Sequence, residues 1–197
     1  KKAKHISQNN ALDYIFGYTI HNDVTSHGLK FGKDSIAITY DQDLARPEFY
    51  KWRNLHSSND TDAYYVYHTR SKGTDTFGPM GPWITTKDEI SDPNNLEVSA
   101  ALNKEVFTVD HTSNYRFSVE ECISEASKYF TLEVGDIISF GTTGKGRGRF
   151  KRGHKSVLLG ELEGTISITI NPLGTLSNKI LHQKGGAWWE EQLTLTK

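Results

Sequence analysis

The chain has 197 residues, enough for one domain with a sizeable buried core. Its 23 basic and 24 acidic residues leave a net charge of −1, so no overall field favours nucleic acid or an acidic membrane as a partner. The single cysteine, Cys122, excludes an internal disulfide, and the sequence has no long apolar run and no signal peptide, so we expect a cytoplasmic protein that does not enter a membrane.

The chain opens at Lys1 within a polar run, so we expect an upstream segment to be missing from the sequence. Residues 8–16 are predicted to form a short helix that ends at Gly17. The apolar–polar alternation that follows predicts a strand from Gly17 to Asp23. A carboxylate held on a strand can ligate a hard metal ion, although an aspartate at a strand end is more often a turn residue.

Residues 26–69 are polar, aromatic-rich and irregular, apart from a short strand predicted over 64–68. Such a stretch is typical of a functional lid or of an inserted excursion. Beyond it, residues 71–77 bring Lys72 and Thr76 close enough in sequence to converge on one point. A lysine near a metal carboxylate can stabilise an enolate or orient a substrate carboxylate, and a solvated surface turn is the alternative.

The prolines within residues 78–83 predict a kinked, extended path that leads into a brief strand over 84–86. Further along, residues 96–102 and 105–109 flank a two-residue turn and predict a β-hairpin.

Ser118 and Glu121 form a capping box, in which each side chain meets a free backbone amide at the start of a helix. Apolar residues then recur at helical spacing, namely Val119, Cys122, Ile123, Ala126 and Phe130. This pattern predicts that Cys122 is a packed thiol and not a nucleophile.

The apolar residues 137–140 predict a strand that ends in a glycine-rich turn, where backbone amides and the Thr142 hydroxyl can hold a carboxylate. The spacing of a nucleotide-binding loop is absent, which argues against a nucleotide site. The basic run from Lys145 to Lys155 favours a solvated loop, or a rim that steers acidic substrates, over nucleic-acid binding.

Residues 156–170 are predicted to hold two more strands, and residues 172–176 to close the sheet. The chain is therefore mainly β with a few helices (α+β), in an antiparallel or mixed architecture and not a doubly wound one. The eight histidines show no metal-like pairing at close spacing, so we expect structural or surface roles for most of them.

Five segments occur in a co-linear order, at residues 11–25, 72–83, 110–117, 132–142 and 173–178. Together they resemble the fumarylacetoacetate hydrolase family, in the branch of the 2-hydroxyhepta-2,4-diene-1,7-dioate isomerases and 5-carboxymethyl-2-oxo-hex-3-ene-1,7-dioate decarboxylases. The resemblance implies a catalytic domain over 1–181, a mixed-strand β-sandwich or roll, with an insertion at about 30–69 and a tail at 182–197.

The resemblance also implies an enzyme that uses Mg²⁺ or Mn²⁺ to bind 2-oxo acids or dioates. Such enzymes hydrolyse, decarboxylate or isomerise their substrates through an enolate, in the catabolism of aromatic or related compounds. It implies a homodimer and a small-molecule 2-oxo acid as partner. It also implies roles for five residues: Asp23 as metal ligand, Lys72 beside metal and substrate, Thr76 in support of the metal's water shell, and Gly141 with Thr142 as carboxylate binders.

Two departures from the family pattern concern the site. The Glu-x-Glu pair that supplies the other two metal ligands, and the residues that act as acid and base, would lie upstream of Lys1. His27 stands where the family has a substrate-binding arginine, and it can replace that donor when suitably placed or protonated. The alternative is therefore a non-catalytic family member that serves as a binding or assembly subunit.

Overall fold

The computed structural model describes residues 1–26, 29, 35–39, 62–66, 68–142 and 163–181. The chain divides into two compact units. Lys1–His21 together with Met80–Lys197 form the first, called here the main unit, and Asn22–Pro79 form the second, called the small unit.

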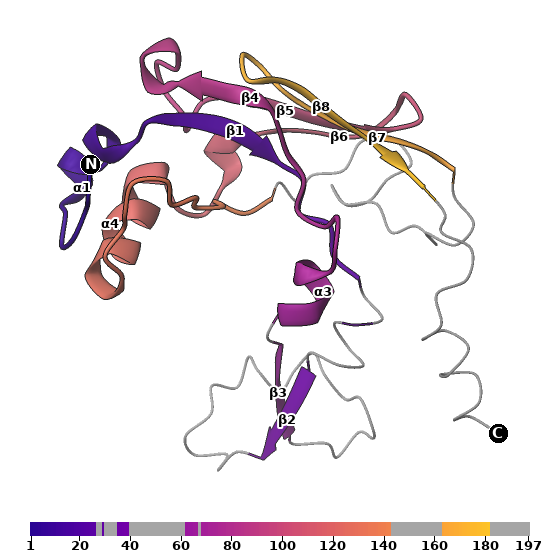
Figure 1. Ribbon diagram of the computed structural model, residues 1–197, viewed down its shortest axis with the longest axis horizontal. Helices are drawn as coiled ribbons and strands as arrows, with labels where there is room; N and C mark the ends of the chain where they lie inside the picture. Colours follow the sequence, from indigo (N-terminus) through magenta and orange to yellow (C-terminus); the bar gives the residue numbers. More distant parts are fainter. Residues whose placement is uncertain (27–28, 30–34, 40–61, 67, 143–162, 182–197) are drawn as a thin grey trace. The chain divides into compact units, whose positions relative to one another are not determined.

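The main unit is built on an antiparallel sheet in the strand order β6-β5-β7-β8 (Figure 1). Its strands are β5 Glu97–Leu102, β6 Glu105–His111, β7 Gly164–Ile170 and β8 Gly174–Ile180. The predicted hairpin is confirmed, because Asn103 and Lys104 join β5 to β6 with φ angles of 50° and 70°. These left-handed values are those of a type I′ turn, whose twist matches that of the flanking strands.

A second, two-stranded sheet pairs β1 (Gly17–His21) with β4 (Met80–Thr86) and packs against β7 and β8. Ile20 of β1 is only 1% exposed. It lies in a core cluster whose other buried members are Ile90, Leu173 and Leu176. Burial of this face fixes the register of β1, the strand that leads into the candidate site.

Helix α4 (Val119–Tyr129) begins at the predicted capping box, which is confirmed. The Glu121 backbone N–H donates to the Ser118 hydroxyl at 3.1 Å, and the Ser118 backbone N–H donates to the Glu121 carboxylate at 2.7 Å. These two bonds satisfy amides that the helix itself leaves without partners.

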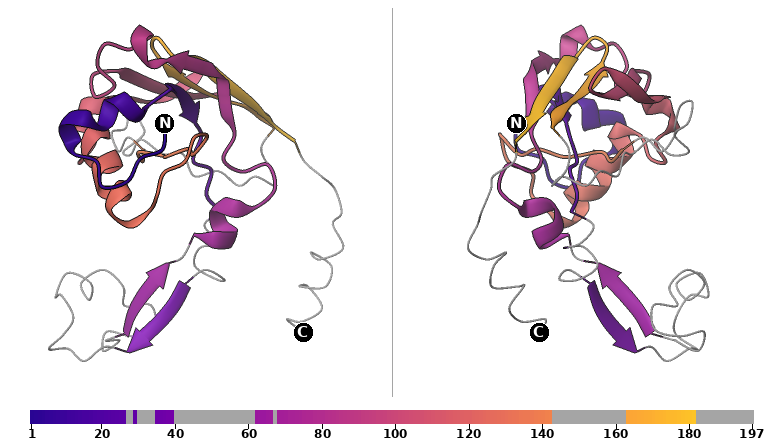
Figure 2. Two further views of the ribbon diagram at one scale, coloured as in Figure 1. Left: turned by 60° about the vertical axis from the view of Figure 1, so that its left-hand side comes forward. Right: turned by 90° about the vertical axis from the view of Figure 1, so that its right-hand side faces the viewer.

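The buried face of α4 packs against α1 (Gln8–Ala11), which a 3₁₀ turn, η1 (Leu12–Tyr14), extends (Figure 2). The helical segment predicted over 8–16 is thus shorter than expected. Phe130, the last of the apolar residues at helical spacing, lies just beyond the end of α4 and is 67% exposed. Cys122 is half-buried, and this burial raises the pKa of its thiol, in line with a packed and unreactive cysteine.

The small unit contains an antiparallel pair of strands, β2 (Ser35–Thr39) and β3 (Asp62–Val66), and a short helix, α3 (Thr69–Gly73). The strand predicted over 64–68 therefore begins and ends two residues earlier. The residues of this unit, 22–79, include the stretch 26–69 that the sequence predicts to be a lid or an inserted excursion.

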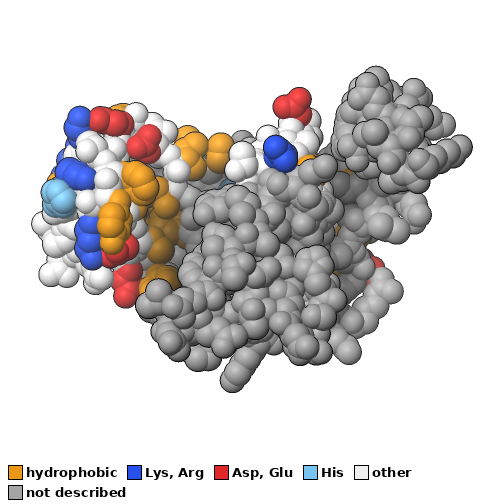
Figure 3. All heavy atoms as spheres, turned by 90° about the horizontal axis from the view of Figure 1, so that it is seen from below, with side chains coloured by type: hydrophobic (Ala, Val, Ile, Leu, Met, Phe, Trp, Pro, Cys, Tyr) orange, Lys and Arg blue, Asp and Glu red, His pale blue; other side chains and the backbone are white. Residues whose placement is uncertain are grey.

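The predicted fold class, mainly β with a few helices, is confirmed. No helix in the described part of the chain has the length and hydropathy needed to cross a membrane. On the face shown in Figure 3, lysine, arginine and acidic side chains are interspersed among hydrophobic ones, so the described surface there carries no field of a single sign.

Gly17 is predicted to be intolerant of a side chain. A Cβ at this position would lie 2.4 Å from the Thr85 carbonyl oxygen and 2.7 Å from Cγ2 of Ile84, so β1 and β4 would have to separate. We expect Gly17→Ala to lower the free energy of unfolding by about 1–3 kcal/mol in chemical denaturation. The control is Gly73→Ala, whose Cβ meets nothing within 4 Å; an equal loss in both variants would contradict the steric explanation.

Tyr18 is expected to make the fold sensitive to alkali. Burial, aided by the negative charges of Glu120 and Asp92, raises the pKa of Tyr18 to about 12. The unfolded chain loses this proton near pH 10, so the free energy of unfolding should fall between roughly pH 10 and 12. In Tyr18→Phe this part of the slope should vanish in denaturation curves recorded across that range, and an unchanged slope would contradict the assignment.

Candidate functional site

Asp23 lies in a turn just beyond β1. The strand and its ladder with β4 end at His21, so the prediction of a strand that continues to Asp23 was wrong. The Asn22 N–H still donates to the Pro79 carbonyl at 3.0 Å, but Pro79 has no N–H to return the bond, so the ladder ends there. The Val24 N–H then donates to the Asn22 carbonyl at 2.8 Å. The second bond closes a three-residue turn around Asp23 and holds its backbone in place of a strand ladder.

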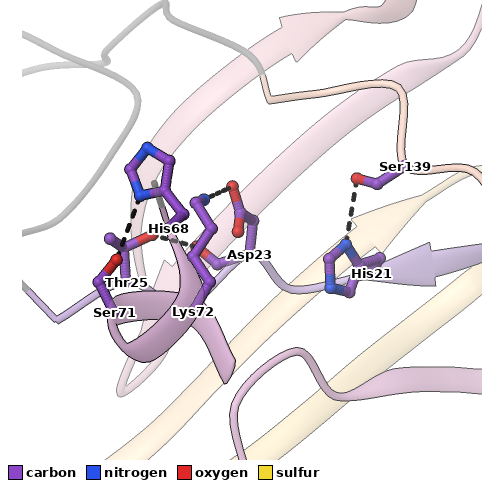
Figure 4. A network of polar contacts seen from close by, with 7 residues as sticks. All are labelled: His21, Asp23, Thr25, His68, Ser71, Lys72 and Ser139. Atoms are coloured by element: carbon purple, nitrogen blue, oxygen red, sulfur yellow. Dashed lines mark hydrogen bonds and ion pairs between the residues drawn. The ribbon is translucent and has the colours of Figure 1, made fainter. Parts of the chain in front are cut away.

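Lys72 lies in α3, and its ammonium forms an ion pair with the Asp23 carboxylate (Figure 4). The two residues are 49 positions apart in the sequence. Their segments are joined by a hydrogen bond from the Ser26 N–H to the Ser71 carbonyl at 2.9 Å, and Ser71 is 0% exposed. Two residues predicted from separate motifs therefore meet in the small unit.

The two side chains of this ion pair are each 31% exposed. A pair in this setting is partly solvated and contributes at most about 1 kcal/mol to folding. The carboxylate and the ammonium consequently remain accessible to a ligand from solution. Close by, Nδ1 of His68, the residue that precedes α3, lies 3.2 Å from the Ser71 hydroxyl (Figure 4).

Thr76 follows α3 in a left-handed backbone conformation, with φ of 69°. This is rare for a β-branched residue, and such strain, about 1–3 kcal/mol, is concentrated at functional sites. No hydrogen bond from Thr76 to Asp23 or Lys72 is found among these described side chains. His27, predicted as a substitute donor, lies outside the described residues.

Gly141 and Thr142 are exposed and lie in the main unit, in the segment that follows α4. The strand predicted over 137–140 is absent, since these residues pair with none of the described strands. Instead, Ile138 and Phe140 pack against the α1–α4 cluster. Gly141 has a φ of 104°, a conformation that only glycine adopts without strain.

His21 and Ser139 make a hydrogen bond that sequence reasoning missed, with Nδ1 and Oγ 3.2 Å apart (Figure 4). The position of His21 at the end of an otherwise apolar and hydroxyl-bearing strand was an available signal. Ser139 carried none, because its partner is 118 positions away.

The predicted site residues thus form two groups, with Asp23, Lys72 and Thr76 in the small unit and Gly141 and Thr142 in the main unit. Among the residues that the structure describes, no group of three or more His, Cys, Asp or Glu side chains could hold a metal ion. Mg²⁺ and Mn²⁺ require several oxygen ligands. Asp23 therefore fits one ligand position of such a site, and the described residues do not complete it.

A family model described as "Fumarylacetoacetate (FAA) hydrolase C-terminal" matches residues 1–181. The chain is also similar to the curated "Oxaloacetate tautomerase YisK" of Bacillus subtilis, with 33% identity over 185 residues, 91% of this chain and 48% of that protein. The chain spans about half the length of the curated relatives it matches.

Two solved structures have the same fold. The 2-hydroxyhepta-2,4-diene-1,7-dioate isomerase from Mycobacterium marinum superposes with a TM-score of 0.64 and 28% identity, covering 94% of this chain and 55% of that one. The maleylpyruvate hydrolase from Sphingobium sp. SYK-6, in complex with manganese(II) ion and pyruvate, superposes with a TM-score of 0.61 and 23% identity. It covers 92% of this chain and 50% of that one.

The ion pair between Asp23 and Lys72 can be measured by a double-mutant cycle of Asp23→Asn and Lys72→Met. We expect a coupling of up to about 1 kcal/mol in the free energy of unfolding, which falls at high salt because exposed charges are screened. The control is the Glu125–Lys128 pair of α4, whose side chains are 55% and 56% exposed and whose coupling should be smaller. Zero coupling of Asp23 with Lys72 at low salt would show that the pair does not form in solution.

Proposed function

The chain belongs to the fumarylacetoacetate hydrolase family, and from this premise we propose that it forms the catalytic part of an enzyme that interconverts the enol and keto forms of 2-oxo acids or dioates. The observation that carries the proposal is the Asp23–Lys72 pair. It presents a carboxylate and an ammonium side by side, at a position where both are still partly open to solvent.

The chemistry of this pair suits the stabilisation of an enolate. When an enol becomes a ketone, the enol oxygen loses a proton and the neighbouring carbon gains one, and negative charge passes over the oxygen. An ammonium group has three N–H donors, and Asp23 accepts from Lys72, so Lys72 can also donate to a substrate oxygen. A donor aimed at an oxygen where charge develops stabilises the transition state more than the ground state.

We assign the substrate carboxylate to Gly141 and Thr142. The Gly141 backbone N–H and the Thr142 hydroxyl are both neutral donors that can bond to the oxygens of a carboxylate. In the same proposal Thr76 supports the water shell of the metal ion. A homodimer and a small-molecule 2-oxo acid partner belong to it as well.

A divalent cation with Asp23 among its ligands would supply Lewis-acid polarisation of the 2-oxo group. The hard oxygen of Asp23 supports Mg²⁺ or Mn²⁺ over softer metals. The maleylpyruvate hydrolase of the same fold was solved with manganese(II) and pyruvate. In our proposal the remaining ligands come from outside the described residues.

We favour isomerisation over C–C bond hydrolysis and decarboxylation because of the names of two relatives. Among the three proteins compared above, these two have the highest sequence identity to this chain. The protein that is 33% identical is named an oxaloacetate tautomerase, and the solved structure that is 28% identical is named a dioate isomerase. Both names describe a proton transfer next to a 2-oxo or enol group. A place in the catabolism of aromatic or related compounds would follow if a longer dioate is the substrate.

The test is the rate at which the full-length protein, supplied with Mn²⁺, converts enol-oxaloacetate and an enol dioate to their keto forms, followed by ultraviolet absorbance. We expect Lys72→Met and Asp23→Asn to lower kcat/KM by about 10²–10³. The matched control, Lys179→Met, removes an exposed lysine of β8 and should leave the rate unchanged.

Wild-type activity in Asp23→Asn would show that the proposed site is wrong. If the wild-type protein accelerates neither reaction and also cleaves or decarboxylates neither substrate, a binding or assembly subunit replaces the enzyme as the better interpretation.

A further inference from the structure

The hydrogen bond between His21 and Ser139 connects the end of β1 with the segment that follows α4. His21 is the last residue of β1, and Ser139 precedes Gly141 by two positions. The bond therefore ties the end of a core strand to the segment that carries the proposed carboxylate-binding residues.

The strand side of this connection is rigid. His21 forms the last pair of the β1–β4 ladder, opposite Met80, and the preceding Ile20 is buried in the core. The imidazole is half-buried at this end of the strand. It can therefore serve as a fixed point for whatever it contacts.

The segment side is held less firmly. Leu132 bridges to Ala3, and the Asp136 N–H closes a turn onto the Glu133 carbonyl at 3.2 Å. Beyond Asp136, the described contacts of the segment are made by side chains, through the packing of Ile138 and Phe140 and the hydroxyl of Ser139. The bond to His21 thus holds Ser139, two residues before Gly141.

We propose that His21 is a positioning residue. Its ring holds Ser139 and thereby sets where the Gly141 amide and the Thr142 hydroxyl meet the carboxylate of a 2-oxo acid. Because only two residues separate Ser139 from Thr142, a shift at Ser139 is passed on to the Thr142 hydroxyl, and a misplacement of about 1 Å weakens a hydrogen-bonded ligand markedly. This proposal rests on the proposed function for the identity of the ligand.

The experiment is calorimetric titration of pyruvate into the full-length protein loaded with Mn²⁺. His21→Ala and Ser139→Ala should each weaken pyruvate about three- to tenfold, the range expected for one partly exposed hydrogen bond. The double variant should be no weaker than either single one, because both remove the same bond. In steady-state assays, KM should rise while kcat is kept.

Two further variants separate positioning from a general structural role. His21→Asn places an amide near the position of Nδ1 and can still bond to a hydroxyl, so it should restore binding, whereas the longer His21→Gln should not. Ser113→Ala is the matched control, since it removes a His–Ser hydrogen bond of 2.7 Å to His111 elsewhere in the same unit, and it should leave pyruvate binding unchanged.

Two results would overturn the positioning role and leave the proposed carboxylate site intact, provided that Thr142→Val binds pyruvate weakly. The first is that the losses of affinity in His21→Ala and Ser139→Ala add up in the double variant. The second is that both single variants bind pyruvate as tightly as the wild type does. If Thr142→Val also binds pyruvate as the wild type does, the carboxylate site itself is wrong and the positioning role falls with it.

Discussion

The burial of one face of β1 is the constraint on which the candidate site depends. Ile20, 1% exposed, packs with Leu173 and Leu176 against the larger sheet, and a slip of one residue would move it to the opposite face. Gly17 lets β4 approach closely at the start of the strand, and His21 closes the ladder at its end. The chain therefore leaves the core at a fixed point, and both the turn to Asp23 and the contact to Ser139 start from there.

Local patterns in the sequence predicted the elements that local interactions determine. The β5–β6 hairpin and the capping box of α4 depend on residues adjacent in sequence, and both are confirmed. The end of β1 depends on Pro79, which accepts a bond from Asn22 but has no N–H to return one. The absence of a strand over 137–140 goes with the lack of a pairing partner among the described strands. Neither is visible in alternation of residue types. The sequence identified Asp23 and Lys72 separately, but only the fold shows that they form a pair.

The physical character of that pair is what connects structure to function. An ion pair with both side chains 31% exposed stabilises a fold only weakly, so folding alone is a poor reason for bringing together residues from two distant motifs. Thr76, four residues after Lys72, keeps a strained left-handed backbone in the same unit. A carboxylate, an ammonium and local strain together are more typical of a ligand site than of a surface turn. Family membership supports the ligand class that we propose, a 2-oxo acid with a divalent cation.

The central claim is that Asp23 is a ligand of that cation, and calorimetric titration of Mn²⁺ into the full-length protein tests it most directly. The account predicts that Asp23→Asn weakens Mn²⁺ binding by at least about tenfold, since one charged oxygen ligand is lost. Asp75→Asn, which neutralises an exposed aspartate three residues after Lys72, should bind Mn²⁺ as the wild type does. Equal Mn²⁺ affinity in the wild type and Asp23→Asn would contradict the account.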